Sequence, residues 1–305
     1  MVSSDDVRSA QERVGARIRR TPVLENGPVA FKLEYLQHAG SFKTRGMLNQ
    51  ILAGAERGGL PAAGIIAASG GNAGLAAAYA ARELGVPAEV YVPQTAPAVK
   101  VAKLTKLGAQ VVQAGSEYAE AYEAALVQAG VTGALFCHAY DNADMVAGSG
   151  TLGLELLEQL PAGFDTVLVA VGGGGLVAGM AAALPRHISV VSVEPASCPA
   201  LHAALAAGGP VDVPVAGVAV DSLGARRVGT IAYDLAVSSG ISSVLVDDQA
   251  IVDARRQLWE DFRIVVEHGT ATAQAALLSG AYRPAVGERV VVLLCGANTN
   301  PADLA

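Results

Sequence analysis

The sequence Thr-Val-Leu-Val-Ala-Val-Gly-Gly-Gly-Gly occupies residues 166–175. Its first six residues are apolar or β-branched, a composition typical of a strand that is buried on both faces of a sheet. Four glycines follow at once, and we predict a helix from there to residue 184. A strand, a glycine-rich loop and a helix in this order form the repeating unit of parallel α/β sheets.

The same alternation of strand and helix extends over most of the chain. Short apolar runs predict further strands at residues 31–34, 64–68, 88–92, 110–112, 134–137, 188–193, 242–246 and 289–294. Capping residues and helical periodicity predict helices at about 4–18, 43–56, 73–84, 98–107, 116–129, 151–160, 248–259 and 270–278. We find no internal repeat or long linker. The pattern predicts an α/β fold with mostly parallel sheets covered by helices on both faces.

Composition and charge narrow the class of protein. The chain has 305 residues, of which 52% are hydrophobic and 16% charged, enough for one large or two modest globular domains. The net charge of −7 argues against a nucleic-acid partner, which requires a basic surface. No apolar run is long enough to cross a membrane, and the acidic start is unlike a signal peptide. Three cysteines without metal-type spacing fit a reducing cytoplasm.

Little sequence follows the last predicted strand, so we expect no appended regulatory domain. His138, His202 and His268 lack catalytic or metal spacing, and we expect structural roles for them.

Three loops follow predicted strands and carry glycines or polar side chains. They are residues 69–72 (Ser-Gly-Gly-Asn), 172–175 (four glycines) and 295–298 (Cys-Gly-Ala-Asn). In open parallel sheets, ligands bind beyond the carboxyl ends of the strands. We therefore expect these three loops to meet in one cleft.

The glycine run Gly172, Gly173, Gly174 and Gly175 suits a phosphate group. Without Cβ atoms, successive backbone N–H groups can turn toward one anion at the positive end of the following helix. A tightly packed turn is the alternative. The run does not match the dinucleotide pattern clearly, although Glu194 lies at about the distance of a ribose-binding acid, so a nucleotide remains a minor alternative.

The other two loops have equally ordinary alternatives. Ser69, Gly70, Gly71 and Asn72 offer a hydroxyl, an amide and open N–H groups that suit a carboxylate, but a plain helix cap has a similar composition. Cys295 follows a buried strand, where most free cysteines only pack.

A lysine stands in a distinctive setting at residues 40–46, which read Gly-Ser-Phe-Lys-Thr-Arg-Gly. Most lysines are solvated surface charges, and a catalytic lysine needs a pKa lowered by burial or by neighbouring charges. Lys43 alone is therefore weak evidence for chemistry, and its significance depends on the three loops.

Taken together, these motifs resemble the fold type II enzymes that use pyridoxal phosphate (PLP), specifically the serine/threonine dehydratases (ammonia-lyases) and the related serine racemases. The resemblance covers nearly the whole chain. The matching stretches are Ser-Phe-Lys-Thr-Arg-Gly at 41–46, the loops at 69–72, 172–175 and 295–298, and Val-Glu-Pro at 193–195.

The resemblance implies a role for each of these residues. Lys43 would hold PLP covalently and act as the base at the substrate α-carbon, and Ser69 is counted with it among the catalytic residues. Ser69, Gly70, Gly71 and Asn72 would bind the substrate. The cofactor would be held by Phe42, Lys43, Asn72, Gly172, Gly173, Gly174, Gly175 and Cys295. Phe42 would pack on the ring, Asn72 would bind its 3-hydroxyl, and Cys295 would sit by its nitrogen.

The resemblance also implies a tryptophan synthase β-like fold of two domains. Residues 1–50 and 146–305 would form a large PLP-binding domain, and residues 51–145 a small substrate-binding domain. The expected activity is elimination from L-threonine and/or L-serine, giving a 2-oxo acid and ammonia. The expected partners are a small amino-acid substrate and a second copy of the chain in a homodimer.

Some positions depart from the family pattern and leave alternatives open. The acid that accompanies Glu194 in cation-binding relatives is missing, so we expect no metal site. No serine hydroxyl is obvious opposite Lys43, which disfavours racemisation, although Ser69 is a candidate. Ser222 and His268 alter the surroundings of the β-substituent. Serine racemase, 3-hydroxyaspartate dehydratase and a cysteine synthase-like β-replacement enzyme remain alternatives.

Overall fold

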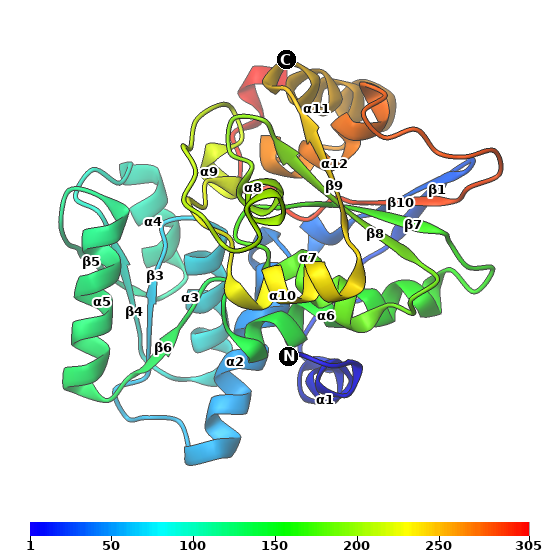
Figure 1. Ribbon diagram of the computed structural model, residues 1–305. Coiled ribbons are helices and arrows are strands. Elements are labelled where there is room, and N and C mark those ends of the chain that lie inside the picture. The colour runs from blue at the N-terminus through cyan, green and yellow to red at the C-terminus, as the bar shows by residue number, and fades with distance from the viewer. Residues whose placement is uncertain (305) are drawn as a thin grey trace.

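The computed structural model describes residues 1–304. In this part of the chain the strands form two sheets (Figure 1). The larger sheet has six strands in the order β1-β2-β10-β7-β8-β9. Its strands are β1 (Val23–Asn26), β2 (Val29–Lys32), β7 (Thr166–Ala170), β8 (Ser189–Pro195), β9 (Ser242–Val246) and β10 (Val290–Leu293). The β1–β2 pair is antiparallel and every other pairing in this sheet is parallel.

The smaller sheet has four parallel strands in the order β5-β4-β3-β6. They are β3 (Ile65–Ala68), β4 (Ala88–Val92), β5 (Gln110–Gln113) and β6 (Leu135–Cys137). All four lie inside the range that we assign to the small domain. The domain boundaries themselves stay a proposal, and one of them, residue 50, falls within a continuous helix, α2 (Lys43–Gly58).

Helices cover both faces of each sheet. Besides α2 they are α1 (Ser4–Val14), α3 (Asn72–Leu84), α4 (Ala98–Lys106), α5 (Tyr118–Thr132), α6 (Ala143–Gln159), α7 (Gly175–Ala183), α8 (Ala200–Ala207), α9 (Val220–Leu223), α10 (Thr230–Ser239), α11 (Asp248–Phe262) and α12 (His268–Leu278). Alternate residues of β7 enter opposite cores: Val167 and Val169 join α6, α7 and α10, whereas Leu168 and Ala170 join α11 and α12. The predicted α/β fold class is confirmed.

Some predicted bounds need correction, and some elements were not predicted. The first helix ends at Val14, before Gly15, and not at residue 18. The hairpin strand β1 was not predicted, and the stretch between β8 and β9, expected to be irregular, contains α8, α9 and α10. Short length and weak periodicity account for these omissions.

Helix α6 begins at Ala143 and not at residue 151. Its first turns contain Gly148 and Gly150, which favour a loop in a single sequence. The structure explains these glycines by close helix packing. A Cβ on Gly148 would lie 2.7 Å from the Arg45 carbonyl oxygen of α2, and one on Gly150 would lie 2.7 Å from the Gly179 carbonyl oxygen of α7.

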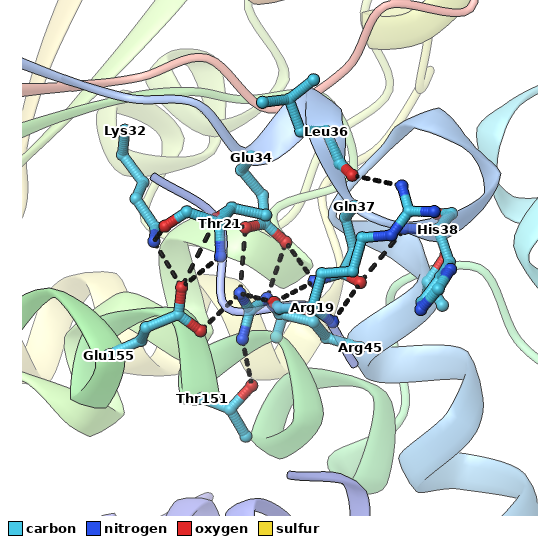
Figure 2. Close-up of polar contacts among 12 residues, drawn as sticks. Arg19, Thr21, Lys32, Glu34, Leu36, Gln37, His38, Arg45, Thr151 and Glu155 are labelled. Atoms are coloured by element: carbon cyan, nitrogen blue, oxygen red, sulfur yellow. Dashed lines mark hydrogen bonds and ion pairs between the residues drawn. The ribbon is translucent and has the colours of Figure 1, made fainter. Parts of the chain in front are cut away.

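Four charged side chains form a buried cluster where β2, α2 and α6 meet (Figure 2). Arg45 Nε lies 2.6 Å from Glu34 Oε1, and Arg45 Nη2 lies 2.8 Å from Glu155 Oε2. Lys32 pairs with Glu155 and donates to the Thr21 carbonyl oxygen at 2.6 Å. The two cations balance the two carboxylates. This cluster, which water barely reaches, therefore carries no net charge.

Removing one charge from this cluster is expected to destabilise the fold strongly. Glu34→Gln leaves the Arg45 guanidinium short of one carboxylate in a site where Glu34 is 0% exposed. The expected loss in the free energy of unfolding is about 3 kcal/mol or more, measured by urea denaturation. The matched control is Glu158→Gln, which breaks the exposed Arg20–Glu158 pair and should cost about 0.5 kcal/mol. Equal small losses in both variants would contradict this view of the cluster.

Candidate active site

The lysine loop is fastened to the end of β10. The Phe42 N–H donates to the Cys295 carbonyl oxygen at 2.9 Å, and Ser41 forms a bridge with Gly296. Lys43 is the first residue of α2, directly after this attachment. Two segments more than 250 residues apart are thus held side by side by main-chain contacts.

The Lys43 side chain is half-buried. Its Nζ donates to the Ala139 carbonyl oxygen at 2.6 Å and lies 4.9 Å from the centre of the Phe42 ring. Burial lowers the pKa of the amine to about 8, partly opposed by the nearby Cys295. A substantial fraction of the amine is therefore neutral at slightly alkaline pH, which is the form that attacks carbonyls and accepts protons.

Cys295 is buried at the end of β10, where its side chain contacts Thr270. The Sγ–Oγ1 distance is 3.4 Å, and the Thr270 hydroxyl donates to the Gly296 carbonyl oxygen at 2.8 Å. Burial raises the pKa of the thiol to about 12, so it stays protonated and neutral. The site therefore offers an uncharged group at this position.

The loop of residues 69–72 joins β3 to α3 and is ordered by side-chain contacts. The Gly71 N–H donates to Ser69 Oγ at 3.2 Å. Asn72 Nδ2 donates to Glu267 Oε1, and Asn72 Oδ1 accepts from Asn298 Nδ2, each at 2.7 Å. The start of α3, the residue before α12 and the 295–298 loop meet at this one amide.

The glycine loop between β7 and α7 leaves no room for side chains. A Cβ on Gly173 would lie 2.3 Å from Tyr140 Cγ. Gly174 has a φ of +91°, and a Cβ there would lie 2.4 Å from the Cβ of Ala232. Tyr140 directly follows Ala139, whose carbonyl oxygen accepts the hydrogen bond from Lys43 Nζ. The loop therefore lies close to the lysine and presents main-chain N–H groups at the start of α7.

Several residues of this site escaped the sequence analysis. The sequence alone assigned no role to Glu267, yet burial raises the pKa of its carboxyl to about 7, against hydrogen bonds from Asn72 and the Asn298 backbone. Tyr140 and Thr270 were not singled out. Glu267 follows an extended apolar pair and precedes a helix, which is the only local signal that could have marked it.

The Glu194 carboxylate caps helix α8. Its oxygens accept the N–H groups of Leu201 at 2.7 Å and His202 at 2.8 Å. Across residues 1–304, no group of three or more His, Cys, Asp or Glu side chains could hold a metal ion. No helix in the same range is long and apolar enough to cross a membrane.

Comparison with known proteins defines the class. Residues 15–296 match the family profile described as pyridoxal-phosphate dependent enzyme. The chain belongs to this family and has its fold type II architecture.

Individual relatives lie within this class. The chain is 36% identical to an L-threonine ammonia-lyase from Geobacter sulfurreducens, over 95% of this chain and 74% of that protein. It is 37% identical to a phenylserine dehydratase from Ralstonia pickettii, over 94% and 90% of the two chains. Among solved structures, maize serine racemase is similar with a TM-score of 0.92 and 30% identity, covering 99% and 95%.

The residues present fit PLP. Lys43 supplies a primary amine of lowered pKa, and the Gly172–Gly175 run presents main-chain N–H groups that no side chain of the run covers. The neutral thiol of Cys295 lies in the same site.

Adding a methyl group to the cradle should weaken cofactor binding. In Gly173→Ala the new Cβ meets the Tyr140 ring, and overpacking of this kind costs about 1–3 kcal/mol. The dissociation constant for PLP should therefore rise about tenfold to a hundredfold, measured by absorbance titration of the apoprotein. Gly130→Ala is the control, because a Cβ there meets nothing within 4 Å. Unchanged PLP affinity in Gly173→Ala would rule out this role of the loop.

The pH dependence of cofactor attachment should report the amine of Lys43. Only the neutral amine reacts, so the attachment rate should rise about tenfold per pH unit below pH 8 and level off above it. An ordinary lysine would continue to gain reactivity up to about pH 10. Stopped-flow absorbance of apoprotein mixed with PLP measures the profile. Lys43→Ala should abolish attachment and exposed Lys106→Ala should not, and a rise that continues to pH 10 would disprove the lowered pKa.

Proposed function

We propose that the protein catalyses PLP-dependent β-elimination of L-threonine and/or L-serine, producing a 2-oxo acid and ammonia. The observation that carries the proposal is the partly neutral Lys43 amine beside the uncharged Cys295 thiol. The names of the relatives, an L-threonine ammonia-lyase and a phenylserine dehydratase, support elimination from a 3-hydroxy amino acid.

Each predicted cofactor contact becomes part of this proposal. Lys43 would hold PLP covalently, Phe42 would cover one face of its ring, and Asn72 would bind the 3-hydroxyl. Gly172–Gly175 would bind the phosphate and Cys295 would contact the ring nitrogen. Bound PLP would supply the electron sink for the charge that develops at the substrate α-carbon.

The protein's own groups account for proton movement and orientation. The neutral Lys43 amine accepts the α-proton at Nζ, which the Ala139 carbonyl keeps within the site at 2.6 Å. The N–H groups of Ser69–Asn72 hold the substrate carboxylate at the start of α3. The Cys295 thiol holds its own proton too tightly to protonate a basic nitrogen, so the electron sink is weak and prompt loss of the β-hydroxyl is favoured.

Racemisation is the competing activity on the same scaffold. It needs a proton donor on the face of the substrate opposite Lys43, and the only candidate we identified is Ser69. The Ser69 oxygen already accepts the Gly71 N–H at 3.2 Å. This contact leaves the Ser69 O–H free to donate, so product analysis has to compare elimination with racemisation on L-serine, L-threonine and 3-hydroxyaspartate. A cytoplasmic homodimer stays a prediction.

Product analysis tests the proposal. Holoenzyme incubated with L-serine, L-threonine or 3-hydroxyaspartate should release ammonia and 2-oxo acid in equal amounts from at least one of them, and form little D-isomer by chiral chromatography. Lys43→Ala should abolish both products because it removes base and attachment point together. Lys106→Ala, an exposed change on α4, should behave as the wild type. D-isomer in excess over ammonia would overturn the assignment.

A further inference from the structure

A lysine outside the motifs discussed so far lies beside the loop of residues 69–72. Lys100 belongs to α4, which packs with the small sheet, and Asp221 belongs to α9, which packs with α12 of the large sheet. The Lys100 Nζ–Asp221 Oδ1 distance is 3.1 Å. In Figure 1, α4 and α9 lie on the facing sides of the two halves.

The Lys100 side chain runs beside the loop of residues 69–72. A Cβ on Gly70 would lie 3.8 Å from Lys100 Cδ, and a Cβ on Gly71 would lie 3.7 Å from the Asp221 carbonyl oxygen. The two charged residues and the two glycines line the same cleft, together with Asn72, Glu267 and Asn298. The absence of a larger side chain at Gly70 gives the ammonium group access to whatever the loop binds.

The cleft contains charged side chains of both signs. Asp221 and Glu267 line it, together with Lys100 and Lys103. No arginine lines the cleft, and Lys43 is committed to Ala139 and to the proposed cofactor. A carboxylate held by main-chain N–H groups is stabilised further by a nearby cation, and of the two lysines in the cleft Lys100 is the one whose Cδ lies 3.8 Å from the Cβ position of Gly70.

The Lys100–Asp221 pair is weak enough to be exchanged. The Asp221 side chain is 80% exposed and that of Lys100 is 31% exposed. Solvent screens such a pair, so its two partners separate at little cost. A ligand carboxylate that is also held by the loop competes effectively for the same ammonium group.

We propose that Lys100 binds the α-carboxylate of the amino-acid substrate, exchanging Asp221 for the substrate when the loop of residues 69–72 is filled. This role rests on the proposed function in one respect only, namely that the site binds an amino acid. The loop thus contributes neutral N–H groups to the carboxylate site, and Lys100 contributes the positive charge. Asp221 holds the lysine in place between turnovers.

Binding of an unreactive pair of ligands tests this role directly. L-Alanine has no β-leaving group, and ethylamine is the same molecule without the carboxylate. Calorimetric titration of holoenzyme should show that Lys100→Gln weakens L-alanine binding about 5- to 20-fold and leaves ethylamine binding unchanged. Asp221→Asn should tighten L-alanine binding about twofold, because the competing carboxylate is gone. Lys106→Gln, on the same helix and exposed, is the matched control.

Kinetics give a second readout. For the substrate that is turned over, Lys100→Gln should raise KM about 5- to 20-fold and change kcat less than about twofold, since the contact holds carboxylate equally before and during reaction. Equal effects on L-alanine and ethylamine, no effect on either, or a wild type that binds both equally well would overturn the role of Lys100. Lys100-dependent alanine binding without ammonia release would instead refute the proposed lyase activity and leave this inference standing.

Discussion

The buried cluster of Arg45, Glu34, Glu155 and Lys32 fixes the element on which the chemistry depends. Arg45 lies two residues after Lys43 in α2, so their side chains leave the helix about 200° apart. One faces the site and the other faces the cluster. Because a buried guanidinium tolerates only a narrow geometry between two carboxylates, the first turn of α2 is held against β2 and α6. This constraint therefore fixes the position of Lys43.

The second attachment sets the electrostatics of the site. Main-chain contacts between residues 41–42 and 295–296 bring amine and thiol into one poorly solvated space. The same loss of water acts on both groups in the direction of neutrality: it lowers the pKa of Lys43 and raises that of Cys295. A single cause thus yields an amine that is partly neutral near pH 8 and a thiol that keeps its proton. Neither effect needs a charged neighbour.

The local sequence was sufficient to predict elements whose ends are set by neighbouring residues. The strands at 88–92 and 242–246 match prediction residue for residue, since each is a short apolar run between clear breaks. Motif order also predicted that Lys43 and the three loops meet in one cleft, and the structure joins the lysine loop to residues 295–296 and Asn72 to Asn298. The start of α6 was missed because its glycines are required by close packing against α2 and α7, which are distant in sequence. Glu267 and Tyr140 were missed for the same reason: their importance comes from Asn72 and Gly173, which only the tertiary fold places beside them.

The two sides of the site are joined in different ways. Near Lys43, α2 packs against α6 so closely that a Cβ on Gly46 would lie 2.2 Å from Met145 Sδ, and this junction is dry. Across the loop of residues 69–72, the contacts are polar: Asn72 with Glu267 and Asn298, and Lys100 with Asp221. Water can replace each such contact at a net cost of about 0.5–1.5 kcal/mol, whereas separating the packed helices would expose apolar surface. The loop of residues 69–72 can therefore exchange its polar contacts while the helix that carries Lys43 remains fixed.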